Sequence, residues 1–291
     1  MIRIGGHEFS DPIIIASGIL PDVANYIENF CKKYKPSAIT TKTFTLDPLE
    51  PHYPPTLIKV HEGCYINAIG LGNPGIETIN SINTECPLIA SVGGKSIDEI
   101  VKAVERIRND KVVIVELNLS SPNRAGYGQD MASYVGEIVK NVKGITKLPV
   151  FVKFGPWDNI NELVGKALAN GADGVTLINT VKVLSVDIYS AKPLLKYGTG
   201  GLSGKCIHPL AVRIIKEVYE EYSVDIIGMG GVFDWRDAVE LIEVGAKLVG
   251  LGTVIIDKGP NAITEIRIGL QNFLSEKGLK IKDLIGIAVR K

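Results

Sequence analysis

The sequence predicts an α/β fold in which eight parallel strands close into a barrel, and three observations support that prediction. Eight short, almost wholly apolar runs recur along the chain, as expected for strands that are covered on both faces. Longer segments with apolar residues at helical spacing separate most of them. Such units in a chain of 291 residues match the usual size of a (β/α)8 TIM barrel. A doubly wound open sheet is the alternative.

The expected strands share β-branched composition and short length. They are residues 12–16, 38–41, 87–90, 112–117, 150–154, 174–177, 225–228 and 248–251. Helix start signals lie between them. Ser96 with Glu99 forms a capping box that predicts a helix over 96–109, and Asn159 with Glu162 repeats the pattern.

The chain is expected to form one barrel domain over residues 1–291, because no linker-like change in composition divides it. The stretch 43–87 is too rich in turns to form a single helix. We therefore expect it to fold as a hairpin-like cap over the face where the strands end. Active sites of such barrels lie on that face.

Charge and cysteine content argue against several classes of protein. Lys and Arg number 32 against 32 Asp and Glu, which gives no broad electrostatic footprint for nucleic acid. Cys31, Cys64, Cys86 and Cys206 form no C-x-x-C pair, so no metal site is expected, and they are interpreted as reduced, mostly buried thiols. Neither a signal peptide nor a membrane span is recognised, which favours a cytoplasmic protein.

Polar side chains gather where the expected strands end. They are Ser17 after the first strand, Lys42 and Thr43 after the second, Asn118, Ser121 and Asn123 after the fourth, Lys153 in the fifth, and Asn179 and Thr180 after the sixth. The loop from 118 to 128 could close over a substrate, or it could be a plain Ser-Pro-Asn turn. Lysine is rarely buried without a partner. Lys153 therefore indicates a structural ion pair or, as its barrel position favours, a charge that neutralises an anionic cofactor.

Glycine clusters supply a second kind of binding signal. Segment 67–75 combines glycines with carboxamides that donate and accept hydrogen bonds, although a tight turn is the alternative. Clusters 228–232 and 250–253 occupy the phosphate-binding position of barrels, where free amides and a helix start favour an anion. No G-x-G-x-x-G follows the first strand, so the usual NAD fingerprint is absent.

Together these motifs resemble the dihydroorotate dehydrogenase family of flavoproteins over essentially the whole chain. The resemblance is carried by Ala16-Ser17-Gly18, Thr41-Lys42-Thr43, Asn67 to Gly75, Asn118 to Asn123, Lys153, Asn179-Thr180, Gly200 to Gly204, Gly230-Gly231 and Gly252-Thr253. It implies that FMN binds across the barrel mouth. It also implies that dihydroorotate is oxidised to orotate in pyrimidine (UMP) biosynthesis.

The resemblance further implies which residues hold each ligand. The expected FMN contacts are Ala16, Ser17, Lys42, Thr43, Asn118, Lys153, Ile178, Gly204, Gly230, Gly231, Gly252 and Thr253, with the last four at the phosphate. The expected substrate contacts are Lys42, Asn67, Ile69, Gly70, Leu71, Asn118, Asn123, Asn179 and Thr180. A cation at Lys153 would stabilise negative charge on the reduced flavin ring.

Ser121 occupies the family's base position, two residues before Asn123. There it would remove the C5 proton while the C6 hydride passes to flavin N5. Soluble members usually carry cysteine at this position, and serine is typical of the membrane-attached class. A hydroxyl is a weaker acid than a thiol of pKa about 8.5, so it needs a relay or high pH. Ser120 and Cys64 are the alternatives for the base.

The resemblance leaves the electron acceptor and the assembly open. Fumarate, quinone and a partner subunit with FAD and an iron-sulfur cluster that passes electrons to NAD are the alternatives, in a homodimer or a heterotetramer. Two competing functions are a related FMN dihydropyrimidine dehydrogenase and a non-redox isomerase or lyase that uses the same phosphate loops. The non-redox barrel predicts a colourless protein.

Overall fold

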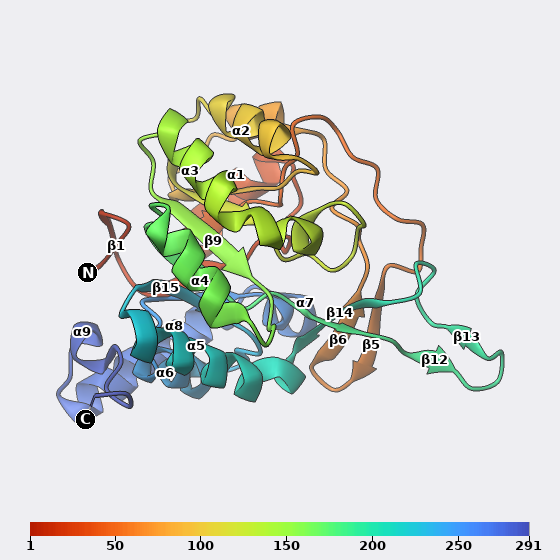
Figure 1. Ribbon diagram of the computed structural model, residues 1–291. Helices are drawn as coiled ribbons and strands as arrows, with labels where there is room; N and C mark the ends of the chain where they lie inside the picture. The colour runs from red at the N-terminus through yellow and green to blue at the C-terminus, as the bar shows by residue number, and fades with distance from the viewer. Residues whose placement is uncertain (291) are drawn as a thin grey trace.

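A computed structural model describes residues 1–290, and its centre is a closed barrel of eight parallel strands (Figure 1). The barrel strands in chain order are β3 (Ile13–Ile15), β4 (Ile39–Thr40), β7 (Leu88–Val92), β8 (Val112–Asn118), β9 (Val150–Phe154), β10 (Gly174–Leu177), β15 (Asp225–Met229) and β16 (Leu248–Leu251). Strand β16 pairs with β3, and β10 pairs with both β9 and β15, so the sheet has no edge. The predicted barrel is therefore confirmed, and the open sheet is wrong.

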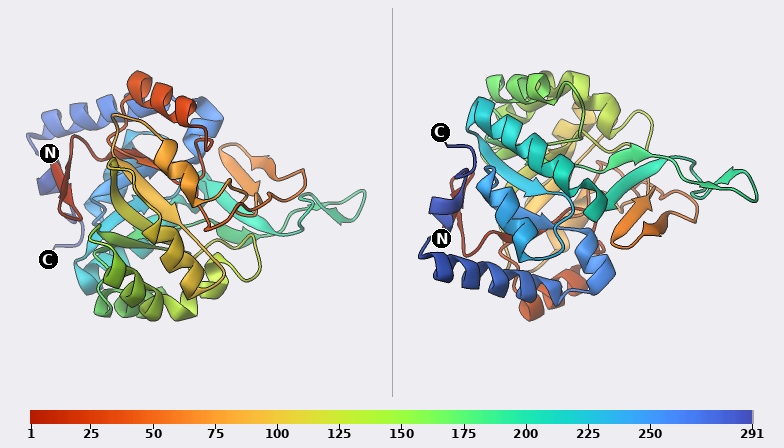
Figure 2. Two further views of the ribbon diagram at one scale, coloured as in Figure 1. Left: turned by 90° about the horizontal axis from the view of Figure 1, so that it is seen from above. Right: turned by 90° about the horizontal axis from the view of Figure 1, so that it is seen from below.

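Helices cover the outside of this barrel (Figure 2). They are α1 (Ala24–Tyr34), α2 (Ile97–Glu105), α3 (Val135–Ile145), α4 (Ile160–Ala169), α5 (His208–Tyr222), α6 (Trp235–Glu243), α7 (Thr253–Lys258), α8 (Ala262–Lys277) and α9 (Ile281–Leu284), with short 3-10 turns η1 (Ile76–Ser81), η2 (Gly128–Tyr134) and η3 (Lys205–Ile207). Each long helix buries one apolar face against the strands, and this burial is the main source of stability.

The two predicted helix starts have different outcomes. The Ser96 side chain accepts from the Glu99 backbone amide, which is one half of the predicted capping box, but the Glu99 carboxylate accepts from the Lys95 amide rather than from that of Ser96. Helix α2 ends at Glu105 rather than at 109. The side-chain amide of Asn109 donates to the carbonyl of Ile79 in η1 and to that of Ile82 just after it, so Asn109 packs against η1 and does not continue the helix. The predicted start at Asn159 is confirmed, because α4 begins at Ile160, but the Asn159 side chain makes no cap hydrogen bond and Glu162 instead pairs with Lys166 one turn along.

Inside the barrel, side chains alternate between the lumen and the helices. The lower lumen is apolar: Ile14, Ile89, Ile114, Phe151 and Ile227 pack into one buried cluster. The antiparallel hairpin of β1 (Ile2–Ile4) and β2 (His7–Phe9) contributes further buried side chains to this cluster. Because this end is filled with apolar side chains, polar chemistry is left to the opposite end of the strands.

A cap stands over that opposite end. It contains a four-stranded antiparallel sheet in the order β11-β14-β6-β5, formed by β5 (Leu57–His61), β6 (Cys64–Asn67), β11 (Val181–Val183) and β14 (Gly200–Gly204). The predicted hairpin within 43–87 is confirmed as β5 and β6. The second half of the sheet, from 181 to 204, was not predicted. It continues into a projecting arm whose hairpin is β12 (Val186–Asp187) and β13 (Lys192–Pro193) (Figure 1).

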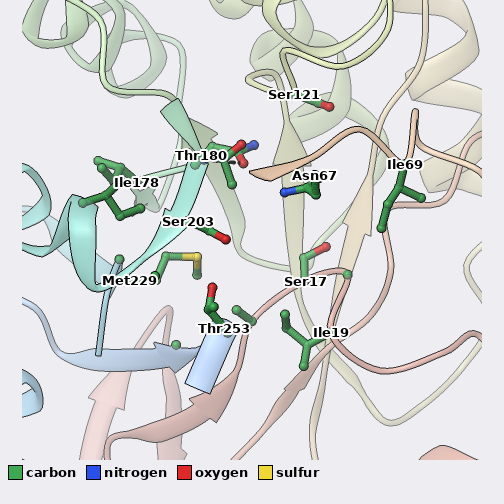
Figure 3. A pocket seen from close by; sticks show the side chains of 18 of the residues that line it. Ser17, Ile19, Asn67, Ile69, Ser121, Ile178, Thr180, Ser203, Met229 and Thr253 are labelled. Atoms are coloured by element: carbon green, nitrogen blue, oxygen red, sulfur yellow. Dashed lines mark hydrogen bonds between the residues drawn. The ribbon is translucent and has the colours of Figure 1, made fainter. Parts of the chain in front are cut away.

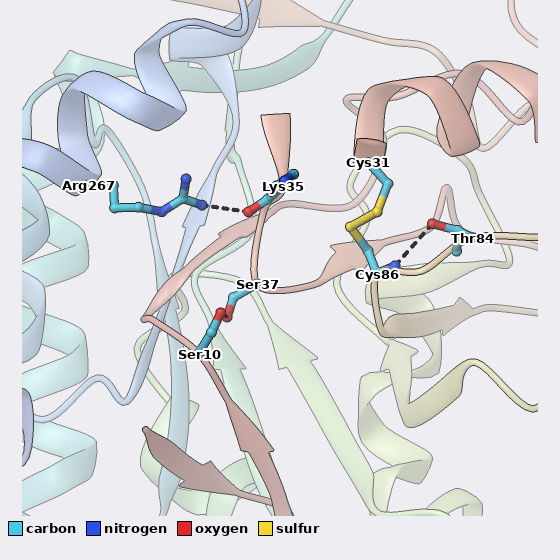
Figure 4. The surroundings of a disulfide bond; sticks show 7 residues. All are labelled: Ser10, Cys31, Lys35, Ser37, Thr84, Cys86 and Arg267. Atoms are coloured by element: carbon cyan, nitrogen blue, oxygen red, sulfur yellow. Dashed lines mark hydrogen bonds between the residues drawn. A yellow bond between two sulfur atoms is a disulfide. The ribbon is translucent and has the colours of Figure 1, made fainter. Parts of the chain in front are cut away.

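The cysteines correct a further expectation, because all four are paired. Cys31 of α1 bonds Cys86 beside β7 (Figure 4), and Cys64 of β6 bonds Cys206 of η3. The prediction of buried side chains holds for three of them, but the prediction of reduced thiols is wrong. Pairs that are 55 and 142 residues apart in sequence meet only because the barrel wall and the cap bring their elements together.

Candidate functional site

A cavity opens between the carboxyl ends of the barrel strands and the cap (Figure 3). Every site residue predicted from the sequence lines it. These are Ala16, Ser17, Lys42, Thr43, Asn67, Ile69, Gly70, Leu71, Asn118, Ser121, Asn123, Lys153, Ile178, Asn179, Thr180, Gly204, Gly230, Gly231, Gly252 and Thr253. The fold thus brings together residues that lie more than 230 positions apart.

Sequence reasoning missed most of the apolar lining. Ile19, Leu57, Ile207, Phe233 and Ile256 also face the cavity. Such residues carry no chemical signal in a sequence that is rich in apolar side chains, although Ile19 and Phe233 follow closely after predicted strand ends. They make the cavity a suitable place for a flat, partly apolar ring.

Lys153 is a buried cation in the cavity wall. The residue stands near the end of β9, is only 5% exposed and lines the cavity. No carboxylate within residues 1–290 forms a salt bridge with it, whereas Lys42 lies 3.8 Å from Asp22. A buried ammonium without a counter-ion is costly unless an anionic group from outside the chain neutralises it. This geometry removes the structural ion pair as an explanation for Lys153.

Two glycine turns shape one end of the cavity. Gly230 and Gly231 have φ angles of 136° and 71°, which disfavour residues with a side chain. A Cβ at Gly230 would lie 2.7 Å from the Ala211 Cβ, and one at Gly231 would lie 2.7 Å from the Cβ of His208. The His208 Nδ1 lies 2.8 Å from the Gly230 carbonyl oxygen and holds the turn in place. The turn is therefore fixed before any ligand arrives.

A cluster of carboxamides lies at the ends of β8 and β10. The Asn118 Oδ1 accepts hydrogen bonds from the Ser120 hydroxyl at 3.2 Å and from the Asn179 side chain at 3.3 Å. The Asn123 amide donates to the Asn67 Oδ1 at 3.2 Å, which joins the loop after β8 to the cap. The Asn123 Oδ1 is buried and has no partner within residues 1–290, so it is available to accept from a ligand.

Ser121 is 7% exposed and lies on the cavity wall (Figure 3). Its carbonyl oxygen accepts from the Gln129 amide, and Gly128, with φ of 51°, packs closely against it. The two alternatives for a base are already engaged. The Ser120 hydroxyl donates to Asn118 and accepts from Asn179, and Cys64 is in a disulfide. Of these three residues, Ser121 is the one that lines the cavity.

Two further observations concern the described residues as a whole. Across residues 1–290 there is no cluster of three or more His, Cys, Asp or Glu side chains that could hold a metal ion. In the same part of the chain, no helix is both long and apolar enough to cross a membrane.

A buried cation and rigid glycine turns at the strand ends of a barrel are typical of enzymes that bind an anionic group at the barrel mouth. The family model described as dihydroorotate dehydrogenase matches residues 1–274. The chain belongs to the dihydroorotate dehydrogenase family and is therefore an oxidoreductase.

Its relatives agree in length as well as in sequence. The chain is 63% identical over 291 residues to the catalytic subunit of dihydroorotate dehydrogenase B (NAD(+)) of Saccharolobus solfataricus, and 58% identical over 292 residues to that of Sulfolobus acidocaldarius, with full coverage on both sides. A putative dihydroorotate dehydrogenase A (fumarate) of Aeropyrum pernix is 37% identical over 99% of this chain and 97% of its own length.

A solved structure supports the fold alone. The Eimeria tenella DHODH in complex with ferulenol superposes with a TM-score of 0.85 at 23% identity, covering 100% of this chain and 88% of that chain. The barrel and cap are thus shared with a protein of very different sequence.

Proposed function

We propose that this protein oxidises dihydroorotate to orotate with FMN bound across the barrel mouth, as one domain over residues 1–291. The buried, uncompensated Lys153 carries the proposal, because oxidation of the substrate must deliver negative charge to a cofactor held beside it. A fixed ammonium aimed at that charge lowers the barrier more than a solvated one would.

FMN fits the residues of the cavity. The Gly230-Gly231 and Gly252-Thr253 turns offer backbone amides to the phosphate, and Gly204 closes the same end. Ala16, Ser17, Lys42, Thr43 and Ile178 would surround the ring system together with Asn118. When bound there, FMN would supply an acceptor for the hydride at its N5 atom.

The carboxamide cluster suits a pyrimidine. Asn67, Asn118, Asn123 and Asn179 can donate to ring carbonyls and accept from ring N–H groups, and the unpartnered Asn123 Oδ1 needs such a donor. Ile69, Gly70, Leu71 and Thr180 would close the pocket around the ring. Lys42 would bind the carboxylate of the substrate and exchange its 3.8 Å contact with Asp22 for that ligand.

Ser121 would take the proton from C5. Its hydroxyl faces the cavity from a loop that is held closed through the Gln129 amide and through Asn123. A closed loop excludes water and keeps the oxygen near the reacting carbon. Because a free hydroxyl is a poor base, the rate should depend on a neighbouring acceptor or on high pH.

The names of the relatives favour a partner subunit as electron acceptor. The two most similar relatives named above are catalytic subunits of a B-type, NAD(+) enzyme. The projecting arm has a surface for such an interaction, because Ile188 and Tyr189 are 80% and 94% exposed there. We place the protein in the cytoplasm as a homodimer or as a heterotetramer with an FAD and iron-sulfur subunit.

An anaerobic visible spectrum before and after addition of dihydroorotate tests the proposal. We expect flavin absorbance that bleaches on mixing, with uracil-type dihydropyrimidines as matched controls that leave it unchanged. A flavin that responds only to dihydropyrimidines lacking the carboxylate would point to the related dehydrogenase. A colourless protein that FMN cannot reconstitute would contradict redox chemistry and favour a non-redox barrel.

A further inference from the structure

A buried carboxylate lies beneath the cavity and has no role in the function proposed above. Glu116 belongs to β8, is 0% exposed and points into the barrel, because its neighbours Val115 and Leu117 belong to the outer core. No Lys, Arg or His within residues 1–290 forms a salt bridge with it. Charged groups are rarely buried unless other groups satisfy them. Each of its two carboxylate oxygens therefore needs a hydrogen-bond partner.

One oxygen ends a chain of hydrogen bonds that reaches the cavity. The Glu116 Oε1 accepts from the Ser91 hydroxyl at 2.9 Å. Because this uses the only hydroxyl hydrogen of Ser91, the 2.9 Å contact between Ser91 and Thr43 must have Thr43 as its donor. Thr43 then accepts from the Asn118 amide at 2.8 Å.

The carboxylate therefore sets the donor and acceptor roles along this whole series of hydrogen bonds. With its amide nitrogen committed to Thr43, Asn118 presents its Oδ1 to Ser120 and Asn179, which is the arrangement observed. If these hydrogen bonds had the opposite direction, Thr43 would donate to Asn118, and the side-chain amide of Asn118 would be flipped. An acceptor at the buried end excludes that alternative.

The other oxygen belongs to a layer of unpartnered polar atoms. The side chains of Thr40, Glu116 and Thr176 all point into the lumen from alternate barrel strands β4, β8 and β10, and such positions form layers. The Thr40 Oγ1, Glu116 Oε2 and Thr176 Oγ1 are each buried without a partner within residues 1–290. Three such oxygens in one layer are the usual surroundings of an ordered internal water.

We propose that Glu116 is a positioning residue for the pocket: through Ser91 and Thr43 it fixes the orientation of Asn118, and its second oxygen binds an ordered water shared with Thr40 and Thr176. The part concerning Asn118 rests on the proposed function, because orotate and FMN are the probes for the pocket. The part concerning the water does not.

A double-mutant cycle tests the hydrogen-bond series from Glu116 to Asn118. Glu116→Leu removes the acceptor and Ser91→Ala removes the link. Each should weaken orotate binding, followed by the shift of the flavin spectrum, by about tenfold. The double variant should bind no worse than either single one, because both break the same chain. Glu116→Gln keeps an acceptor and should bind within about twofold of the unchanged protein.

The outcomes separate the alternatives. Additive losses, or a loss in Glu116→Gln as large as in Glu116→Leu, would overturn the positioning role, because they would indicate independent effects or a role of the charge itself. Thr45→Val is the matched control, since Thr45 is also buried but its hydroxyl bonds Asp47 and Asn73 outside this chain. If Glu116→Leu fails to fold, the comparison of Ser91→Ala with Glu116→Gln still tests the positioning role, because that role predicts weaker orotate binding in the first variant and nearly unchanged binding in the second.

Thermal unfolding of the flavin-free protein tests the water. Thr40→Val and Thr176→Val remove a hydroxyl with little change in shape. If the hydroxyls bind water, each variant should melt at a lower temperature; if they are truly unpartnered, each should melt at the same or a higher temperature, which would refute the water site. This measurement needs neither FMN nor orotate. A protein that ignores both ligands would thus defeat the proposed function and leave this result interpretable.

Discussion

The floor and the roof of the cavity are built in different ways. The floor consists of inward side chains of the barrel, such as Asn118 and Lys153, each 5% exposed and fixed by a strand that is paired on both sides. The roof is the cap sheet with its projecting arm, where Ile188 and Tyr189 are largely exposed.

Different contacts hold the two regions in place. The floor is held by backbone ladders and by the chain that ends at Glu116. The roof is attached at a few points, among them the Cys64–Cys206 disulfide and a hydrogen bond of 2.7 Å from the Tyr65 hydroxyl to Asp257 of α7. From this difference we expect the reaction to depend on the rigid floor and the entry of ligands to depend on movement of the roof.

The largest expected effect concerns Ser121, at the join of floor and roof. Ser121→Ala should slow flavin reduction by dihydroorotate about 10³-fold, because the proton loses its acceptor. Ser120→Ala, the matched control, should cost far less. Stopped-flow absorbance measures both. Equal losses would place the base elsewhere.

The same position gives a pH test. Ser121→Cys should move the rise of the reductive half-reaction to lower pH, since a thiol ionises more readily than a hydroxyl. Superimposable pH profiles for the two proteins would contradict a serine base.

The next effect tests the floor alone. Lys153→Met should slow flavin reduction about 10²-fold and lower the flavin midpoint potential, because the negative charge on the reduced ring loses its fixed cation. Lys182→Met removes the same charge from an exposed position on β11 and should leave both quantities near their original values. A similar loss in both variants would mean that net charge matters rather than position.

Removing each disulfide in turn distinguishes the role of the barrel wall from that of the roof. Replacing Cys31 and Cys86 by alanine should lower the free energy of unfolding by about 4 kcal/mol with KM unchanged, since this bridge closes a 55-residue loop in the barrel wall. Replacing Cys64 and Cys206 should also raise KM, because that bridge fixes the cap over the cavity. Denaturant titration and steady-state kinetics measure the two effects. A KM that stays constant in both pairs would argue against a roof that controls entry.

The smallest effect is a titration in the roof. Burial and the nearby Arg124 guanidinium lower the pKa of His52, whose ring stacks on Tyr197 at 4.1 Å. The native state thus favours the neutral ring, so its contribution to stability is complete above the unfolded pKa of about 6.5 and is lost as pH falls below it. Arg124→Gln should raise the pKa of His52 in an NMR titration. An unchanged pKa would exclude the charge of Arg124 as a cause.

Much of the fold and site follows from sequence. The barrel strands were predicted within about two residues at each end, because each is a short apolar run flanked by turn residues. The strand ends were identified by polar side chains that have no reason to follow an apolar run unless they face a site, as with Asn118 and Lys153. The part of the cap formed by residues 181–204 was missed, because its strands are short and partly exposed.

By itself the sequence determined the barrel, the polar strand ends and the family, since local periodicity and motif order are properties of neighbouring residues. Only the tertiary structure decided that Lys153 has no ion-pair partner among residues 1–290, that the cysteines pair across 55 and 142 residues, and that Glu116 is linked to Asn118 through two hydroxyls. Each of these depends on which side chains from distant segments meet, and burial then gives such contacts their energetic weight.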